Sequence, residues 1–143
     1  KNMKQKILLL FISIAIGTYC HSQCGKKITV SATGAEILNE LGEIKIKDTQ
    51  RVTTIIYDSK VIEIISEMST LYGTVDSIYC NWTIPFKEGN TTIMGTINYE
   101  NGDQRTTKLI ITGKEGKLTL LAEVEHPDAN KMRFVLDKFE EIK

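Results

Sequence analysis

The chain has 143 residues with 18 basic and 18 acidic side chains, so its formal net charge is zero. A chain of this length fits one domain and is long enough to bury a core. Basic runs are missing from it, which argues against a nucleic-acid partner because phosphate binding needs clustered Lys and Arg.

Residues 1–22 have the organisation of a secretory signal peptide. Lysines at the start precede an apolar run over 7–16, and small or polar residues follow. The run is much shorter than the roughly 20 residues that a membrane-spanning helix needs. We expect cleavage between Ser22 and Gln23, which leaves 23–143 as one mature domain without a transmembrane span.

Export predicts a secreted or periplasmic protein, and the composition rich in Lys and Ile favours a bacterial cell envelope. The alternative is a lipoprotein, with the lipid on Cys20 or Cys24. The residues one and three positions before each of these cysteines do not fit the small and aliphatic pattern that lipidation requires. We therefore expect no lipid anchor.

Two cysteines remain after cleavage, Cys24 and Cys80. An even pair in an oxidising compartment usually forms a disulfide, so we expect a bridge between them. The alternative is a buried free Cys80, which would pack as a small apolar residue.

The first half of the mature chain predicts short strands and one helical segment. Gly34 to Leu41 has Ile37, Leu38 and Leu41 on one side, which favours one or two helical turns near the N-terminus. β-branched or alternating runs predict strands over 27–31, 43–47, 52–57 and 61–66.

The second half alternates apolar and polar residues between turn signals. The Asn101-Gly102 pair, for example, is typical of a tight hairpin. Pro85 predicts that its strand ends there or lies at a sheet edge, because proline cannot donate to a ladder. Strands are expected over 77–86, 91–100, 105–112, 117–125 and 131–139.

These patterns predict an all-β domain, an antiparallel meander of eight or nine strands. A meander hides its edge strands either by closing as a barrel of lipocalin-like build or by folding as a two-sheet sandwich. Periodicity alone does not distinguish the two.

Candidate chemistry is sparse in the mature chain. His126 is its single histidine and precedes Pro127 in a polar reversal, where a solvated turn residue is expected. Neither a Ser-His-Asp relay nor a zinc site can be assembled from these residue types. We expect no catalytic residue, no metal site and no cofactor.

Two binding hypotheses follow, with a hydrolase lacking a recognisable site as a third. If the sheet closes, inward residues such as Trp82, Ile97 and Leu120 would line a cavity for an apolar small molecule; the alternative is an ordinary packed core. The second hypothesis is an envelope interaction module or an inhibitor. Apolar residues on the outer face of three successive strands would form its partner surface, or would lie beneath a second layer: Met94, Ile110 and Leu121.

Overall fold

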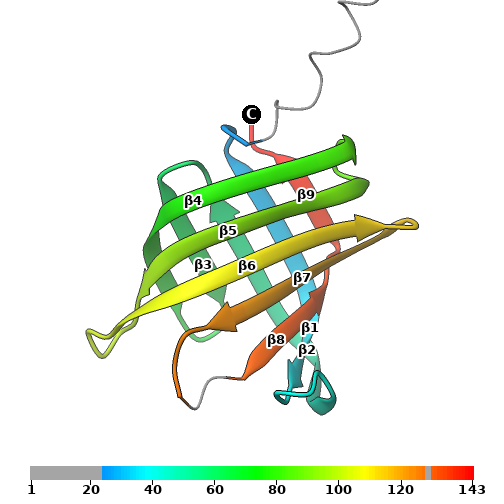
Figure 1. The fold of residues 1–143 in the computed structure, drawn as a ribbon. Helices are drawn as coiled ribbons and strands as arrows, with labels where there is room; N and C mark the ends of the chain where they lie inside the picture. The colour runs from blue at the N-terminus through cyan, green and yellow to red at the C-terminus, as the bar shows by residue number, and fades with distance from the viewer. Residues whose placement is uncertain (1–23, 128–129) are drawn as a thin grey trace, which may run out of the picture.

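The computed structural model describes residues 24–127 and 130–143 (Figure 1). The predicted signal peptide, 1–22, lies outside the described residues. Within them the chain forms nine strands and no helix: β1 (Ile28–Leu38), β2 (Ile44–Tyr57), β3 (Val61–Ser66), β4 (Thr70–Ile84), β5 (Glu88–Asn98), β6 (Gln104–Lys114), β7 (Lys117–Val124), β8 (Lys131–Val135) and β9 (Lys138–Glu141).

Eight of these strands close into an antiparallel barrel. Strands β2 to β8 pair in sequence order, and β1 pairs with both β8 and β2. The ninth strand, β9, continues along the edge of β1 past the end of β8, so that Ile28 to Ser31 face Glu141 to Lys138. The all-β prediction is confirmed, and of the two predicted architectures the chain adopts the barrel.

Period-two alternation explains why these segments become barrel strands. In β5 and β6 every second residue from Thr91 to Gly95 and from Thr107 to Gly113 is buried. A barrel wall requires this pattern, because successive side chains point to opposite faces of the sheet. The inward residues of all strands merge into one core cluster.

The helical turns predicted over Gly34 to Leu41 are wrong. This segment is the second half of β1 and the turn after it. Gly34 has a φ of 91° and lies at a register shift between Thr33 and Ala35. Such a bulge changes the phase of the strand, so that a broken period of two resembles a helical spacing.

Several strand boundaries also differ from the prediction. The segments 43–47 and 52–57 join in the single strand β2, and β4 begins at Thr70 instead of Ser77. The final predicted strand, 131–139, is interrupted between β8 and β9. There the Asp137 amide donates to the Ser31 carbonyl oxygen at 2.8 Å.

The predicted Cys24–Cys80 disulfide is present, with the two Cα atoms 5.8 Å apart. It joins the segment before β1 to β4 across a sequence separation of 56. A loop of this length corresponds to a stabilisation of about 4 kcal/mol in the chain-entropy account. The bridge therefore fixes the segment before β1 to the barrel wall.

Aromatic side chains fill the end of the barrel near the β4–β5 turn. Phe139 of β9 packs against Trp82 at 5.3 Å between ring centroids and against Phe86 at 4.9 Å. Phe86 adopts a φ of 57°, a conformation that non-glycine residues rarely take. We call these three side chains the aromatic plug. The β1–β2, β3–β4, β5–β6 and β7–β8 connections lie at the opposite end, the mouth (Figure 1).

Candidate binding site

The barrel interior holds the three residues predicted to line a ligand cavity. Trp82, Ile97 and Leu120 are 4%, 1% and 1% exposed and belong to the same core cluster. They come from β4, β5 and β7, and each follows the inward phase of its strand.

The polar groups around Trp82 are satisfied within the protein. The Trp82 indole Nε1 donates to Thr91 Oγ1 at 2.7 Å, and the Thr91 hydroxyl lies 3.6 Å from Cys80 Sγ. Burial raises the pKa of the Tyr57 phenol above its ordinary value, and a hydrogen bond with Thr91 opposes part of that rise. We call these four residues the Thr91 network.

One void between core residues is too small for a ligand. A void bordered by Val30, Ile55, Leu120 and Phe134 measures about 10 Å³. This is at the lower limit of what one water molecule needs, far below the 300–1,000 Å³ of typical ligand pockets. In this conformation the three predicted ligand-binding residues pack against protein.

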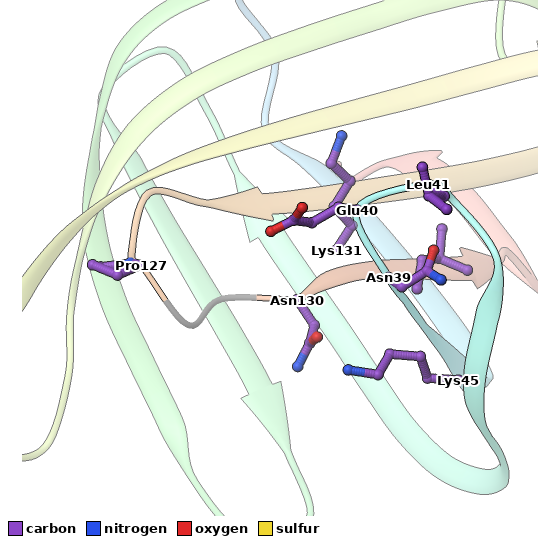
Figure 2. A pocket seen from close by; sticks show the side chains of 8 residues that line it. Asn39, Glu40, Leu41, Lys45, Pro127, Asn130 and Lys131 are labelled. Atoms are coloured by element: carbon purple, nitrogen blue, oxygen red, sulfur yellow. The ribbon is translucent and has the colours of Figure 1, made fainter.

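A larger cavity of about 540 Å³ lies at the mouth, between the β1–β2 turn and the start of β8 (Figure 2). Its apolar members differ in exposure, since Leu38 is 4% exposed and Leu41 is 84% exposed. Figure 2 shows Lys45 of β2 extending toward Asn130. The residues that line it are Leu38, Asn39, Glu40, Leu41, Lys45, Pro127, Asn130 and Lys131.

Sequence reasoning did not find this mouth cavity. Asn39, Glu40 and Leu41 were assigned to the end of a helix, and nothing in the sequence showed that they approach β8. The sequence contains one indication of this cavity, because Leu41 is a large apolar residue in a polar turn.

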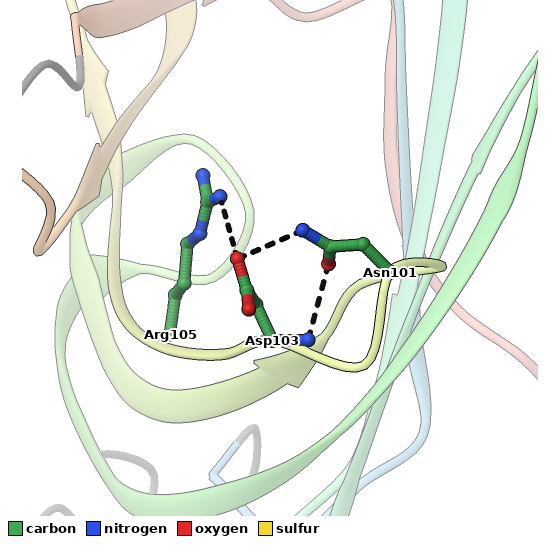
Figure 3. Close-up of polar contacts among 3 residues, drawn as sticks. All are labelled: Asn101, Asp103 and Arg105. Atoms are coloured by element: carbon green, nitrogen blue, oxygen red, sulfur yellow. Dashed lines mark hydrogen bonds and ion pairs between the residues drawn. The ribbon is translucent and has the colours of Figure 1, made fainter.

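The β5–β6 turn at the mouth fixes an arginine against the barrel. The Asp103 carboxylate accepts from the Asn101 amide at 2.8 Å and from the Arg105 guanidinium at 3.2 Å (Figure 3). The hydrogen bond from Asn101 is the main cause that holds the pKa of Asp103 below its ordinary value, and the hydrogen bond from Arg105 is the next. The Arg105 guanidinium also lies 4.4 Å above the Tyr99 ring, in a cation–π arrangement.

An ion-pair cluster joins β1, β2 and β8 on the outer face. Arg133 donates to Glu36 Oε2 from Nε at 2.8 Å and from a terminal nitrogen at 2.7 Å. Lys47 lies 3.6 Å from the other Glu36 oxygen. The Arg133 hydrogen bond is the main cause that lowers the pKa of Glu36.

The apolar residues predicted on the outer face do lie on neighbouring strands. Ile110 of β6 is directly opposite Leu121 of β7, and Met94 of β5 is diagonal to Ile110. All three are half-buried, and the described strands form one sheet, so no second sheet covers them. We call these three residues the outer apolar band.

His126 is exposed in the connection after β7. Across residues 24–127 and 130–143 no three His, Cys, Asp or Glu side chains are arranged to hold a metal ion. The same part of the chain has no helix long and apolar enough to cross a membrane.

Comparisons of the chain with protein-family models, with curated proteins and with solved structures find no match.

Proposed function

We propose that the mature chain is an exported binding protein that recognises a protein partner through its outer surface. The observation that carries the proposal is the contrast between the interior and the outside of the barrel. A void among core residues measures about 10 Å³, whereas no sheet of the described residues covers the outer apolar band. Contiguous apolar patches on a protein surface often mark the binding site of a partner.

The disulfide supports the extracellular or periplasmic part of this proposal. Bridges such as Cys24–Cys80 persist in oxidising compartments and are rare in the cytosol. The bridge also joins the segment before β1 to β4 of the barrel wall.

Capture experiments with matched variants test the proposal. The mature protein would be cross-linked in envelope extracts of its own host, beside Leu121→Lys and Ile84→Lys. Leu121 belongs to the outer apolar band, whereas Ile84 is 45% exposed at the end of β4. We expect one partner that Leu121→Lys loses and Ile84→Lys retains. A partner that both variants retain would contradict the role of the band.

The mouth cavity favours a second function, carriage of a small apolar molecule. Its volume of about 540 Å³ falls within the usual range of ligand pockets, and barrel mouths are common sites for them. A fatty acid bound there would contact Leu41, so that Leu41→Asp would weaken binding. Trp82, in the aromatic plug at the other end, would keep its fluorescence. A change in Trp82 emission would instead indicate binding in the interior.

A further inference from the structure

The N-terminal half of β2 has one edge that no described strand covers. β3 pairs with β2 only from Thr53 to Tyr57, and β1 occupies the opposite edge. Among the described residues, no strand pairs with 44–52 on the β3 side. In an antiparallel ladder, alternate residues of such a strand direct their N–H and C=O groups outward. We call residues 44–52 the free edge.

The side chains at the start of the free edge alternate between apolar and basic. Ile44 and Ile46 are 50% and 57% exposed, which is high for large aliphatic residues. The side chain of Lys47 is 63% exposed, with its ammonium 3.6 Å from Glu36. Lys45 has no ion pair with any described residue. The free edge thus offers backbone groups and two apolar side chains, with two lysines beside them: the Lys47 ammonium also pairs with Glu36 of β1, and Lys45 also borders the mouth cavity.

The space beside the free edge is open where β3 turns away. The chain reverses tightly after Ser66, whose amide donates to the Ser69 carbonyl oxygen at 2.9 Å. A cavity of about 370 Å³ lies there, bordered by Asp48 and Arg51 of β2 and by Met68, which is 90% exposed. An added strand would therefore continue the line of β3 and end against this turn.

We propose that the free edge is a strand-addition site for an extended peptide segment in which apolar residues alternate with Asp or Glu. The inference rests on the proposed function and names its partner class. Backbone hydrogen bonds to 44–48 would supply affinity, as in other cases of strand addition. The acidic residues would face Lys45 and Lys47 and the apolar ones Ile44 and Ile46, because paired residues share a face.

The same features also restrict the site. The register shift between Asp48 and Val52 bends β2, so a guest strand pairs with about five residues. Lysines and bulges on an edge also discourage pairing with unselected strands. The two lysines attract acidic segments and repel basic ones, so the pattern predicts a preference that experiment can measure.

Synthetic peptides test this preference directly. The folded, disulfide-bonded mature protein would be titrated with a fluorescently labelled peptide Thr-Glu-Val-Glu-Val-Thr and with its counterpart Thr-Lys-Val-Lys-Val-Thr. We expect the acidic peptide to bind at least about tenfold more tightly, since two exposed ion pairs replace two repulsions. Hydrogen exchange should slow at the backbone amides of 44–48.

Matched charge reversals localise the effect. Lys45→Glu removes one ammonium group from the free edge and should reduce the preference for the acidic peptide by about fivefold. Lys114→Glu reverses an exposed lysine at the end of β6, away from the mouth, and should leave the preference unchanged. Both positions are exposed, so both variants should fold.

Equal binding of the two peptides, or exchange protection outside 44–48, would overturn the inference. The inference would also be overturned if Lys45→Glu and Lys114→Glu reduced the preference for the acidic peptide equally. The peptide would then be attracted by the net charge of the protein alone. The proposed function is judged separately, by whether the captured partner depends on Leu121. A Leu121-dependent partner without peptide binding would leave the function standing and remove this site.

Discussion

Thr91 shows how a single inward polar residue stabilises the core of this barrel. Its side chain is 1% exposed, yet its hydroxyl accepts the indole hydrogen bond of Trp82 and contacts Cys80. Leaving a buried donor without its hydrogen bond costs more free energy than a typical hydrogen bond contributes. The stability of the core around Trp82 therefore depends on the Thr91 hydroxyl.

Thr91→Val tests this dependence. The substitution keeps the shape of the side chain but removes the hydrogen bond from Trp82 Nε1 to Thr91 Oγ1, and we expect a loss of about 1–3 kcal/mol in the free energy of unfolding. Thr92→Val, on the neighbouring half-buried outward position, should change it by less than about 0.5 kcal/mol. Urea denaturation followed by Trp82 fluorescence measures both. Equal values for the two variants would contradict the account.

The Glu36–Arg133 pair predicts a pH-dependent contribution to stability. The folded-state pKa of Glu36 lies below its ordinary value of 4.5, so the folded state binds its proton less readily than the unfolded state. The stabilisation is complete above pH 4.5 and is lost as the pH falls through the lower folded-state pKa. It amounts to at most about 1 kcal/mol, because solvent reaches the Arg133 side chain, which is 41% exposed, and screens the pair.

A comparison of Glu36→Gln with the parent chain isolates this contribution from other carboxylates. The variant should be less stable at neutral pH and equally stable near pH 3, as measured by denaturation midpoints. Glu140→Gln provides the control, because the Lys138–Glu140 pair has side chains 50% and 57% exposed. A constant difference between Glu36→Gln and the parent chain at all pH values would contradict the assignment.

Among the elements, the strands with uninterrupted alternation were predictable and the bulged ones were not. β5, β6 and β7 follow the expected ranges closely, because each repeats its apolar residues every second position. The sequence of β1 predicts helical turns in its second half, because the phase of the strand changes at Gly34. A bulge is recognised only when the partner strand is known, and here the partner of Gly34 lies in the region of Asp48.

The β5–β6 turn illustrates a second limit of local patterns. Asn101-Gly102 correctly predicted a reversal, but Gly102 alone has a positive φ, 86°. Asn101 instead uses its side chain, whose oxygen accepts from the Asp103 amide at 3.1 Å. The dipeptide thus predicted the place of the turn but not its hydrogen bonding.

Gly89, at the start of β5, should tolerate no side chain. It has a φ of 138°, and an added Cβ would lie 2.2 Å from the Asn81 carbonyl oxygen and 2.5 Å from Trp82 Cα. Gly89→Ala should therefore cost about 2–4 kcal/mol in the free energy of unfolding, since backbone must shift.

Gly116 offers the matched control for Gly89. It also has a positive φ, 76°, but nothing lies within 4 Å of an added Cβ. Gly116→Ala should lower the free energy of unfolding by about 1–2 kcal/mol, which is the cost of the left-handed conformation alone. Thermal or chemical denaturation compares them, and equal losses would show that the contact with β4 at Gly89 is unimportant.

At the scale of the whole molecule, the sequence predicted the core more fully than the sites. Inward residues such as Ile97 and Leu120 are buried as the alternation requires, and the outer apolar band lies on adjacent strands. The mouth cavity and the free edge depend on where strands far apart in sequence begin and end. Such relations follow from register and closure, which local periodicity does not contain.

The central claim is that binding occurs on the outside of a filled barrel. Native mass spectrometry of the protein purified gently from its own host tests it most directly. We expect the mass of the chain with two hydrogens removed by the Cys24–Cys80 bridge, alone or with a protein partner. A co-purified small molecule whose retention is lost on substitution of Ile97 or Leu120 would show an interior that opens for a ligand, and would contradict the claim.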